Sequence, residues 1–162
     1  MAPLQFVITL DETHLDSLHQ ARTIIESGLV REAARNITDQ AAARLDEMVA
    51  AGFTLAGDPL GFRMLDQEFH QTIYQLGNNP FLMVVAQSLY ELGMEYRRVA
   101  TETLGVIERS AAEHQVIVAA LKAGDEAAAV AALNTHLASI HQTTIEAMQL
   151  SFGTRHRRPR SK

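Results

Sequence analysis

Residues 65–82 read LDQEFHQTIYQLGNNPFL, and this stretch decides the fold. Its apolar residues recur every three or four positions, which is the spacing of one face of an α-helix. The Gly-Asn-Asn-Pro sequence at 77–80 ends that helix and starts another, because proline cannot continue a helix but fits its first turn. Asp66 and His70 lie one turn apart on the apolar face, so the stretch predicts a helix that directs two polar side chains into the core.

The rest of the chain shows the same alternation of helical segments and short turns. Helix-forming residues dominate, and the four prolines are confined to positions 3, 59, 80 and 159. We therefore expect an all-α fold of about six helices in one domain. The expected elements are an extended segment at 4–10 and helices near 12–34, 38–51, 59–77, 80–103, 106–123 and 125–150. The expected divisions are a lead-in or linker at 1–11, a ligand-binding helical domain at 12–150 and a basic, disordered tail at 151–162.

The composition excludes several classes of protein. The chain has no cysteine, so disulfides and thiolate sites are excluded and any metal must be bound through nitrogen and oxygen. No apolar run approaches the roughly 20 residues needed to span a bilayer, and the N-terminus lacks the pattern of a signal peptide. We expect a cytoplasmic protein without membrane contact.

The charge is distributed unevenly along the chain. The last eight residues, RHRRPRSK, hold five of the fourteen basic residues and no acidic one, which leaves residues 1–154 with a net charge of −10. An acidic body disfavours a nucleic-acid surface on the folded part, because phosphates are bound by clustered Lys and Arg.

Two further helices carry one histidine each on an apolar stripe. His114 lies between Ala111 and Val118 at helical spacing, and His136 follows Leu133 in the same way. A lone core histidine is usually satisfied by a hydrogen bond. Three such histidines together with Asp66 would be costly to bury without partners, whereas one divalent cation satisfies all of them. We therefore predict a metal site formed by Asp66, His70, His114 and His136.

The ligand set limits the metal and suggests the ligand. One Asp and three neutral imidazoles are compatible with Zn²⁺, Ni²⁺, Mn²⁺ or Fe²⁺, and the sequence does not choose among them. The site keeps a net charge near +1 and, for an octahedral metal, two open positions. Such a centre should attract a small carboxylate effector.

A third kind of polar residue lies on the apolar stripe of the first predicted helix. Arg22 stands there among leucines and isoleucines, and an inward arginine requires an anion. That anion is either Glu26, one turn away, or the carboxylate of a bound effector, and both readings stay open. Arg97 and Arg98 could line the pocket, but a pair that is solvated or faces an interface is expected. His19, His141 and His156 have no carboxylate at ligand spacing and are expected to be surface or satisfied residues.

Two segments resemble a known family. The string at 65–82 resembles the D-x-x-F-H and G-N-x-x-L signature of the FCD domain, the effector-binding half of FadR-type regulators in the GntR family. EHQVIVAALKAGDEAAAVAALNTHL at 113–137 is similar to the second signature of that family, and Arg22 with Glu26 to its R-x-x-x-E start.

The resemblance implies an antiparallel helical bundle around a central metal and ligand cavity, with no catalytic residues. It implies a homodimer whose affinity for operator DNA changes when a small organic acid binds. Members of the family carry a winged helix-turn-helix before the sensor, and only about a dozen residues precede the first predicted helix here. We therefore expect DNA contact only through a domain that this chain lacks.

Two other classes of function compete with this interpretation. A metal-dependent enzyme would need an acid or base near the metal. No spare inward carboxylate is apparent, and Glu113 is expected to point away because it adjoins His114 in sequence. A metal-free helical interaction domain would have histidines that are satisfied core residues. Metal content discriminates between the sensor and the interaction domain.

Overall fold

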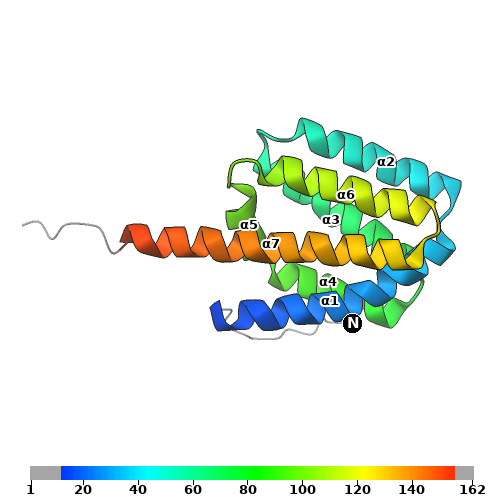
Figure 1. The fold of residues 1–162 in the computed structure, drawn as a ribbon, viewed down its shortest axis with the longest axis horizontal. Coiled ribbons are helices and arrows are strands. Elements are labelled where there is room, and N and C mark those ends of the chain that lie inside the picture. The colour runs from blue at the N-terminus through cyan, green and yellow to red at the C-terminus, as the bar shows by residue number, and fades with distance from the viewer. Residues whose placement is uncertain (1–11, 156–162) are drawn as a thin grey trace, which may run out of the picture.

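The computed structural model describes residues 12–155 and shows an all-helical bundle (Figure 1). This confirms the expected fold class. The described part of the chain contains these helices: α1 (Glu12–Asn36), α2 (Asp39–Thr54), α3 (Pro59–Leu76), α4 (Pro80–Leu92), α5 (Met94–Thr101), α6 (Val106–Lys122) and α7 (Glu126–Arg155). The lead-in at 1–11, the extended segment at 4–10 and His156 lie outside the described residues.

Several turns occur where the sequence predicts them, because they supply a side-chain cap for the next helix. Asp58 and Asn79 precede the prolines that open α3 and α4, and their side chains accept hydrogen bonds from the backbone N–H groups of Gly61 (2.9 Å) and Leu82 (3.1 Å). Side chains of this kind satisfy donors that have no partner inside the helix. Gly124, with φ of 64°, makes the left-handed turn before α7.

Two helix boundaries differ from expectation. The segment 80–103, expected as one helix, is divided at Gly93 into α4 and α5. Glycine weakens a helix interior, and Leu18 of α1 packs close to this position, 3.6 Å from where a Cβ would lie. The last helix continues to Arg155 instead of ending near 150.

The core joins helices from both ends of the chain. α7 packs along α1 and α6, and α3 contacts α1, α2, α4 and α5 (Figure 1). The main apolar cluster contains residues of α1, α2, α3, α6 and α7, including Phe69, Ile117 and Leu133. α3 therefore occupies the middle of the bundle, where its inward side chains meet those of α6 and α7. Within the described helices, none is long and apolar enough to cross a membrane.

The end of α3 approaches α1 so closely that only glycine fits. A Cβ at Gly77 would lie 2.6 Å from Leu29 Cδ2 and 3.0 Å from the Leu29 carbonyl oxygen. We expect Gly77→Ala to lower the free energy of unfolding by about 1–3 kcal/mol, because a packed core must move to admit the methyl group. Urea denaturation measures this.

Gly57→Ala is the matched control, since nothing lies within 4 Å of its added Cβ. Its effect should stay within about 0.5 kcal/mol. A Gly77→Ala protein as stable as the wild type would show that α1 and α3 separate at no cost.

Candidate metal centre

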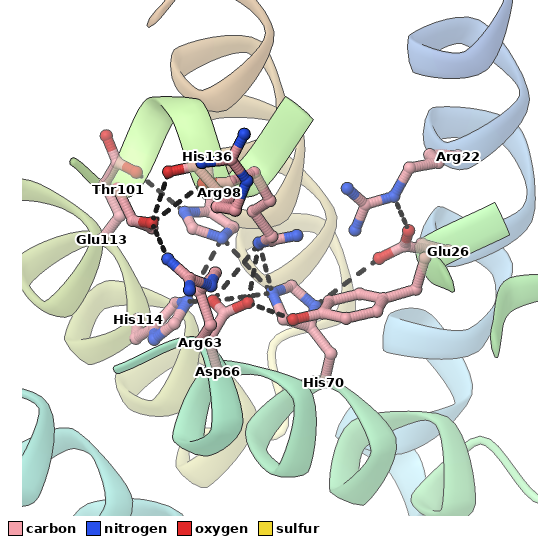
Figure 2. A network of polar contacts seen from close by, with 12 residues as sticks. Arg22, Glu26, Arg63, Asp66, His70, Arg98, Thr101, Glu113, His114 and His136 are labelled. Carbon is pink, nitrogen blue, oxygen red and sulfur yellow. Dashed lines mark hydrogen bonds and ion pairs between the residues drawn. The ribbon is translucent and has the colours of Figure 1, made fainter. Parts of the chain in front are cut away.

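Four polar side chains from three helices meet inside the bundle (Figure 2). α3 supplies Asp66 and His70, α6 supplies His114 and α7 supplies His136. All four are buried, with exposed fractions of 0–4%. One oxygen or nitrogen atom from each lies within 4.8 Å of the others. The structure thus brings together all four residues of the predicted site.

The facing atoms are spaced as the ligands of one cation would be. Nε2 of His136 lies 3.2 Å from Nε2 of His114 and 3.4 Å from Nε2 of His70. Asp66 Oδ1 lies 3.3 Å from His114 Nε2 and 3.6 Å from His70 Nε2. Ligands that bind a metal at about 2.0–2.2 Å are separated from one another by about 3.0–3.5 Å. The donor set therefore fits a divalent metal.

Glu113 determines which ring nitrogen of His136 carries the proton and which faces the centre as an acceptor. Nδ1 of His136 lies 2.7 Å from Glu113 Oε2, and an ionised carboxylate can only accept a hydrogen bond. The proton is therefore on Nδ1, and the lone pair of Nε2 faces the other ligands. Metal-binding histidines have this arrangement, with a carboxylate that orients the ring. Glu113 was expected to point away from His114. It does so, and its side chain contacts His136 on the neighbouring helix α7.

The second ring with an acidic partner is His70. Its Nδ1 lies 3.6 Å from Oε2 of the buried Glu26, and neither atom has a hydrogen-bond partner. Glu26 is only 1% exposed, so a second carboxylate does lie inside the bundle. It is not a spare one, because its other oxygen is paired with Arg22 at 2.6 Å.

Electrostatics favour the neutral forms of His114 and His136 and an ionised Asp66. Desolvation lowers the pKa of His114 to about 4, against the partly opposing effect of Asp66. Desolvation and the other two histidines hold the pKa of His136 well below its usual range. Burial alone would raise the pKa of Asp66, but the charge of Arg97 and the contacts of His70 and His114 keep it well below the usual range. These are the protonation states in which metal ligands bind.

Asp66 has two partners that the sequence did not reveal. Tyr90 donates a hydrogen bond to Oδ2 at 2.5 Å, and Arg97 pairs with the same oxygen through Nε at 2.8 Å. Arg97 is 5% exposed, so the expectation that it is solvated is wrong. Arg98 does face solvent, where it pairs with Glu95 and Glu102.

Arg22 takes part in an internal ion pair and also faces a cavity. Its Nε donates to Glu26 Oε1 at 2.6 Å, while its Nη2 is buried without a hydrogen-bond partner. Desolvation would raise the pKa of Glu26, but the charge of Arg22 lowers it to about 2. The cavity measures about 40 Å³ and is lined by Leu15, Leu18, His19, Arg22, Gly93, Tyr96, Arg97, Leu137, Ile140, His141 and Thr144.

The other described histidines stay outside the cluster. The rings of His19 and His141 stack at 4.5 Å, and His141 Nε2 lies 2.9 Å from Asp16 Oδ1. This agrees with their interpretation as satisfied residues.

Comparison with known proteins identifies the family. The model of the FCD domain matches residues 17–139. The chain belongs to the FCD domain family. The HTH-type transcriptional repressor NanR of Cronobacter sakazakii is 32% identical over 127 residues, which are 76% of this chain and 48% of that protein. The NanR repressor of Salmonella typhimurium is 33% identical over 129 residues, with the same coverage.

Solved structures show the same fold. E. coli McbR/YncC matches 93% of this chain and 76% of its own with a TM-score of 0.73 and 24% identity. Streptococcus agalactiae GntR matches 85% of this chain and 62% of its own with a TM-score of 0.66 and 24% identity. The family consists of domains of GntR-type transcriptional regulators, so the chain is not an enzyme. The chain spans about half the length of the curated relatives it matches.

The lowered pKa of His114 predicts a pH dependence for the metal-free protein. Below pH 6.5 the unfolded chain binds a proton at His114, whereas the folded chain binds it only when the pH falls to about 4. Stability is therefore complete above pH 6.5 and falls by about 3 kcal/mol as the pH decreases to 4. His136 acts in the same direction. Urea denaturation of chelator-treated protein across this range measures the loss.

His114→Gln has no imidazole to titrate at this position and serves as the comparison. Its free energy of unfolding should fall less steeply between pH 6.5 and 4, because its unfolding takes up about one proton fewer per molecule. Equal slopes for the two proteins would contradict the prediction.

Proposed function

We propose that this FCD domain is a metal-containing sensor of a small organic acid in a GntR/FadR-type transcriptional regulator. The observation that supports it is the buried set of three imidazole nitrogens and one carboxylate oxygen within 4.8 Å of one another. Asp66, His70, His114 and His136 would bind the metal, and Glu113 would orient His136. Lone pairs that converge without a cation repel one another, so a bound cation explains the arrangement best.

The bound metal would supply a centre of positive charge with open coordination positions. Zn²⁺, Ni²⁺, Mn²⁺ and Fe²⁺ all accept nitrogen and carboxylate ligands. Asp66 would neutralise one of the two positive charges, and imidazoles bind a metal in their neutral form. A carboxylate ligand would therefore be attracted to this part of the bundle.

Arg22 is the residue that we assign to the effector. Arg22 lines a cavity together with leucines such as Leu18 and Leu137, and its Nη2 is buried without a hydrogen-bond partner. A guanidinium matches the geometry of a carboxylate. At about 40 Å³ the cavity suits a small acid with few carbon atoms.

The relatives named as HTH-type transcriptional repressors suggest the output of the sensor. We propose that occupancy of the bundle alters operator binding by a winged-helix DNA-binding domain, and that the protein acts in the cytoplasm where that DNA lies. No residue of the acidic bundle is assigned to DNA.

Metal content tests the proposal. The untagged chain should contain close to one transition-metal ion, and His114→Ala should lose it. Because metal binding adds to the free energy of folding, the mutation or a chelator should lower the melting temperature by roughly 5 °C or more. Elemental analysis and thermal melts measure both effects. His141→Ala should keep the metal, since this ring lies outside the cluster.

The same melts test the effector. Acetate, glycolate or lactate should raise the melting temperature of the metal-loaded protein, and Arg22→Lys should keep the metal but lose this rise. Arg44→Lys, at an exposed ion pair with Glu68, should behave as the wild type. A wild-type chain with no metal and no response to chelator would overturn the proposal and leave a metal-free interaction domain.

We also propose that the domain forms a homodimer through α4 and α1. α4 contains one charged residue, Glu91, yet only Ala86 and Tyr90 of its thirteen residues are buried. Phe81 (83% exposed) and Val84 (50% exposed) lie one turn apart on it, and Ile24 (66% exposed) belongs to the adjacent α1. A symmetric partner can cover this face without opposing like charges.

Val84→Glu should convert the dimer to a monomer, because it buries a charge in an apolar interface. Sedimentation should give a mass of about twice 17.8 kDa for the wild type and 17.8 kDa for the variant. Leu104→Glu is the control, since Leu104 is 98% exposed between α5 and α6. A Val84→Glu protein that stays dimeric, or a monomeric wild type, would refute this interface.

A further inference from the structure

Arg97 supplies the counter-charge of Asp66. The guanidinium pairs side-on with the carboxylate, with Nε 2.8 Å from Oδ2 and Nη2 3.2 Å from Oδ1. Its Cζ also lies 4.7 Å from the centre of the Tyr90 ring. A buried carboxylate without such a partner would be strongly destabilising. Arg97 thus neutralises the same carboxylate that the metal would bind.

The position of Nη2 brings Arg97 into conflict with a metal. Nη2 lies 3.2 Å from Asp66 Oδ1 and 3.4 Å from His70 Nε2, and both of these atoms belong to the ligand set. A guanidinium carries only donors and cannot itself be a ligand. A divalent cation bonded to these two atoms would face the positive charge of Nη2 at close range.

The cavity beside the site offers Arg97 another anion. Arg97 lines it together with Arg22, whose Nη2 is buried without a hydrogen-bond partner. Two guanidinium groups that border one small cavity form a bidentate receptor for a carboxylate. The same side chain can therefore serve Asp66 or a carboxylate in the cavity.

We propose that Arg97 exchanges between these two anions. It pairs with Asp66 in the metal-free domain, gives up Oδ1 when a metal occupies the site, and then binds the carboxylate of the effector beside Arg22. Metal and acid consequently bind with positive coupling, so the acid binds more tightly to the domain that holds metal. This inference rests on the proposed function.

The coupling is measured on the wild type first. Zn²⁺ affinity, determined by chelator competition, should rise about tenfold at saturating acetate relative to chloride at equal ionic strength, and acetate affinity should rise by the same factor with Zn²⁺. In Arg97→Gln, Zn²⁺ alone should bind about tenfold more tightly than in the wild type, and the coupling should largely disappear. Arg98→Gln, at an exposed neighbour, should match the wild type.

The outcomes separate the inference from the function on which it rests. If the wild type binds no Zn²⁺, both are overturned. If the wild type binds Zn²⁺ but Arg97→Gln binds it equally or more weakly, or if the coupling survives in Arg97→Gln, only the exchange is overturned, because Arg97 is then a fixed support of Asp66. If Arg97→Gln does not fold without metal, Arg97→Lys replaces it in these measurements. The wild type also tests the exchange by itself, because a Zn²⁺ affinity that does not change with acetate refutes it.

Discussion

The burial of one ionised carboxylate, Asp66, is the constraint on which the rest of the interior depends. An isolated carboxylate in a low-dielectric interior is costly, so every group around it compensates for its charge. Tyr90 donates a hydrogen bond, Arg97 pairs with it, and His70 and His114 face it from two helices. The polar centre therefore links α3, α4, α5 and α6, in addition to the apolar core.

The helix ends make this centre possible because they fix where α3 lies. Its first turn is capped by Asp58, and its last turn closes on Gly77 against the backbone of α1. With both ends fixed, the one-turn spacing of Asp66 and His70 presents their side chains to α6 and α7. Phe69 stacks on His114 at 4.0 Å, so the apolar core also orients one of the imidazoles.

Helical periodicity predicts the four residues of the buried cluster because each interrupts an apolar stripe on its own helix. The test is local, and it needs no knowledge of which helices are neighbours. Glu113 and Arg97 fail that test for different reasons. Glu113 is only partly buried on α6, and its side chain contacts His136 on α7. Arg97 reaches Asp66 from α5, a helix that exists only because Gly93 divides a segment with the composition of a single helix. Which side chains pair between helices depends on how the helices pack, so the spacing of residues along the sequence does not predict it.

Stability and sensing make opposite demands on Arg97. A carboxylate permanently neutralised by arginine gives a stable domain with a poor metal site, whereas an unpaired carboxylate gives a strong metal site in a domain that folds poorly without metal. A mobile guanidinium between Asp66 and a second anion meets both demands, because the acid compensates Arg97 when the metal compensates Asp66. In the buried Arg22–Glu26 pair Nε donates to Glu26, while Nη2 is buried without a hydrogen-bond partner. In the proposed sensor the two arginines would have different roles, with Arg22 as the fixed receptor of the acid and Arg97 as the group whose pairing changes.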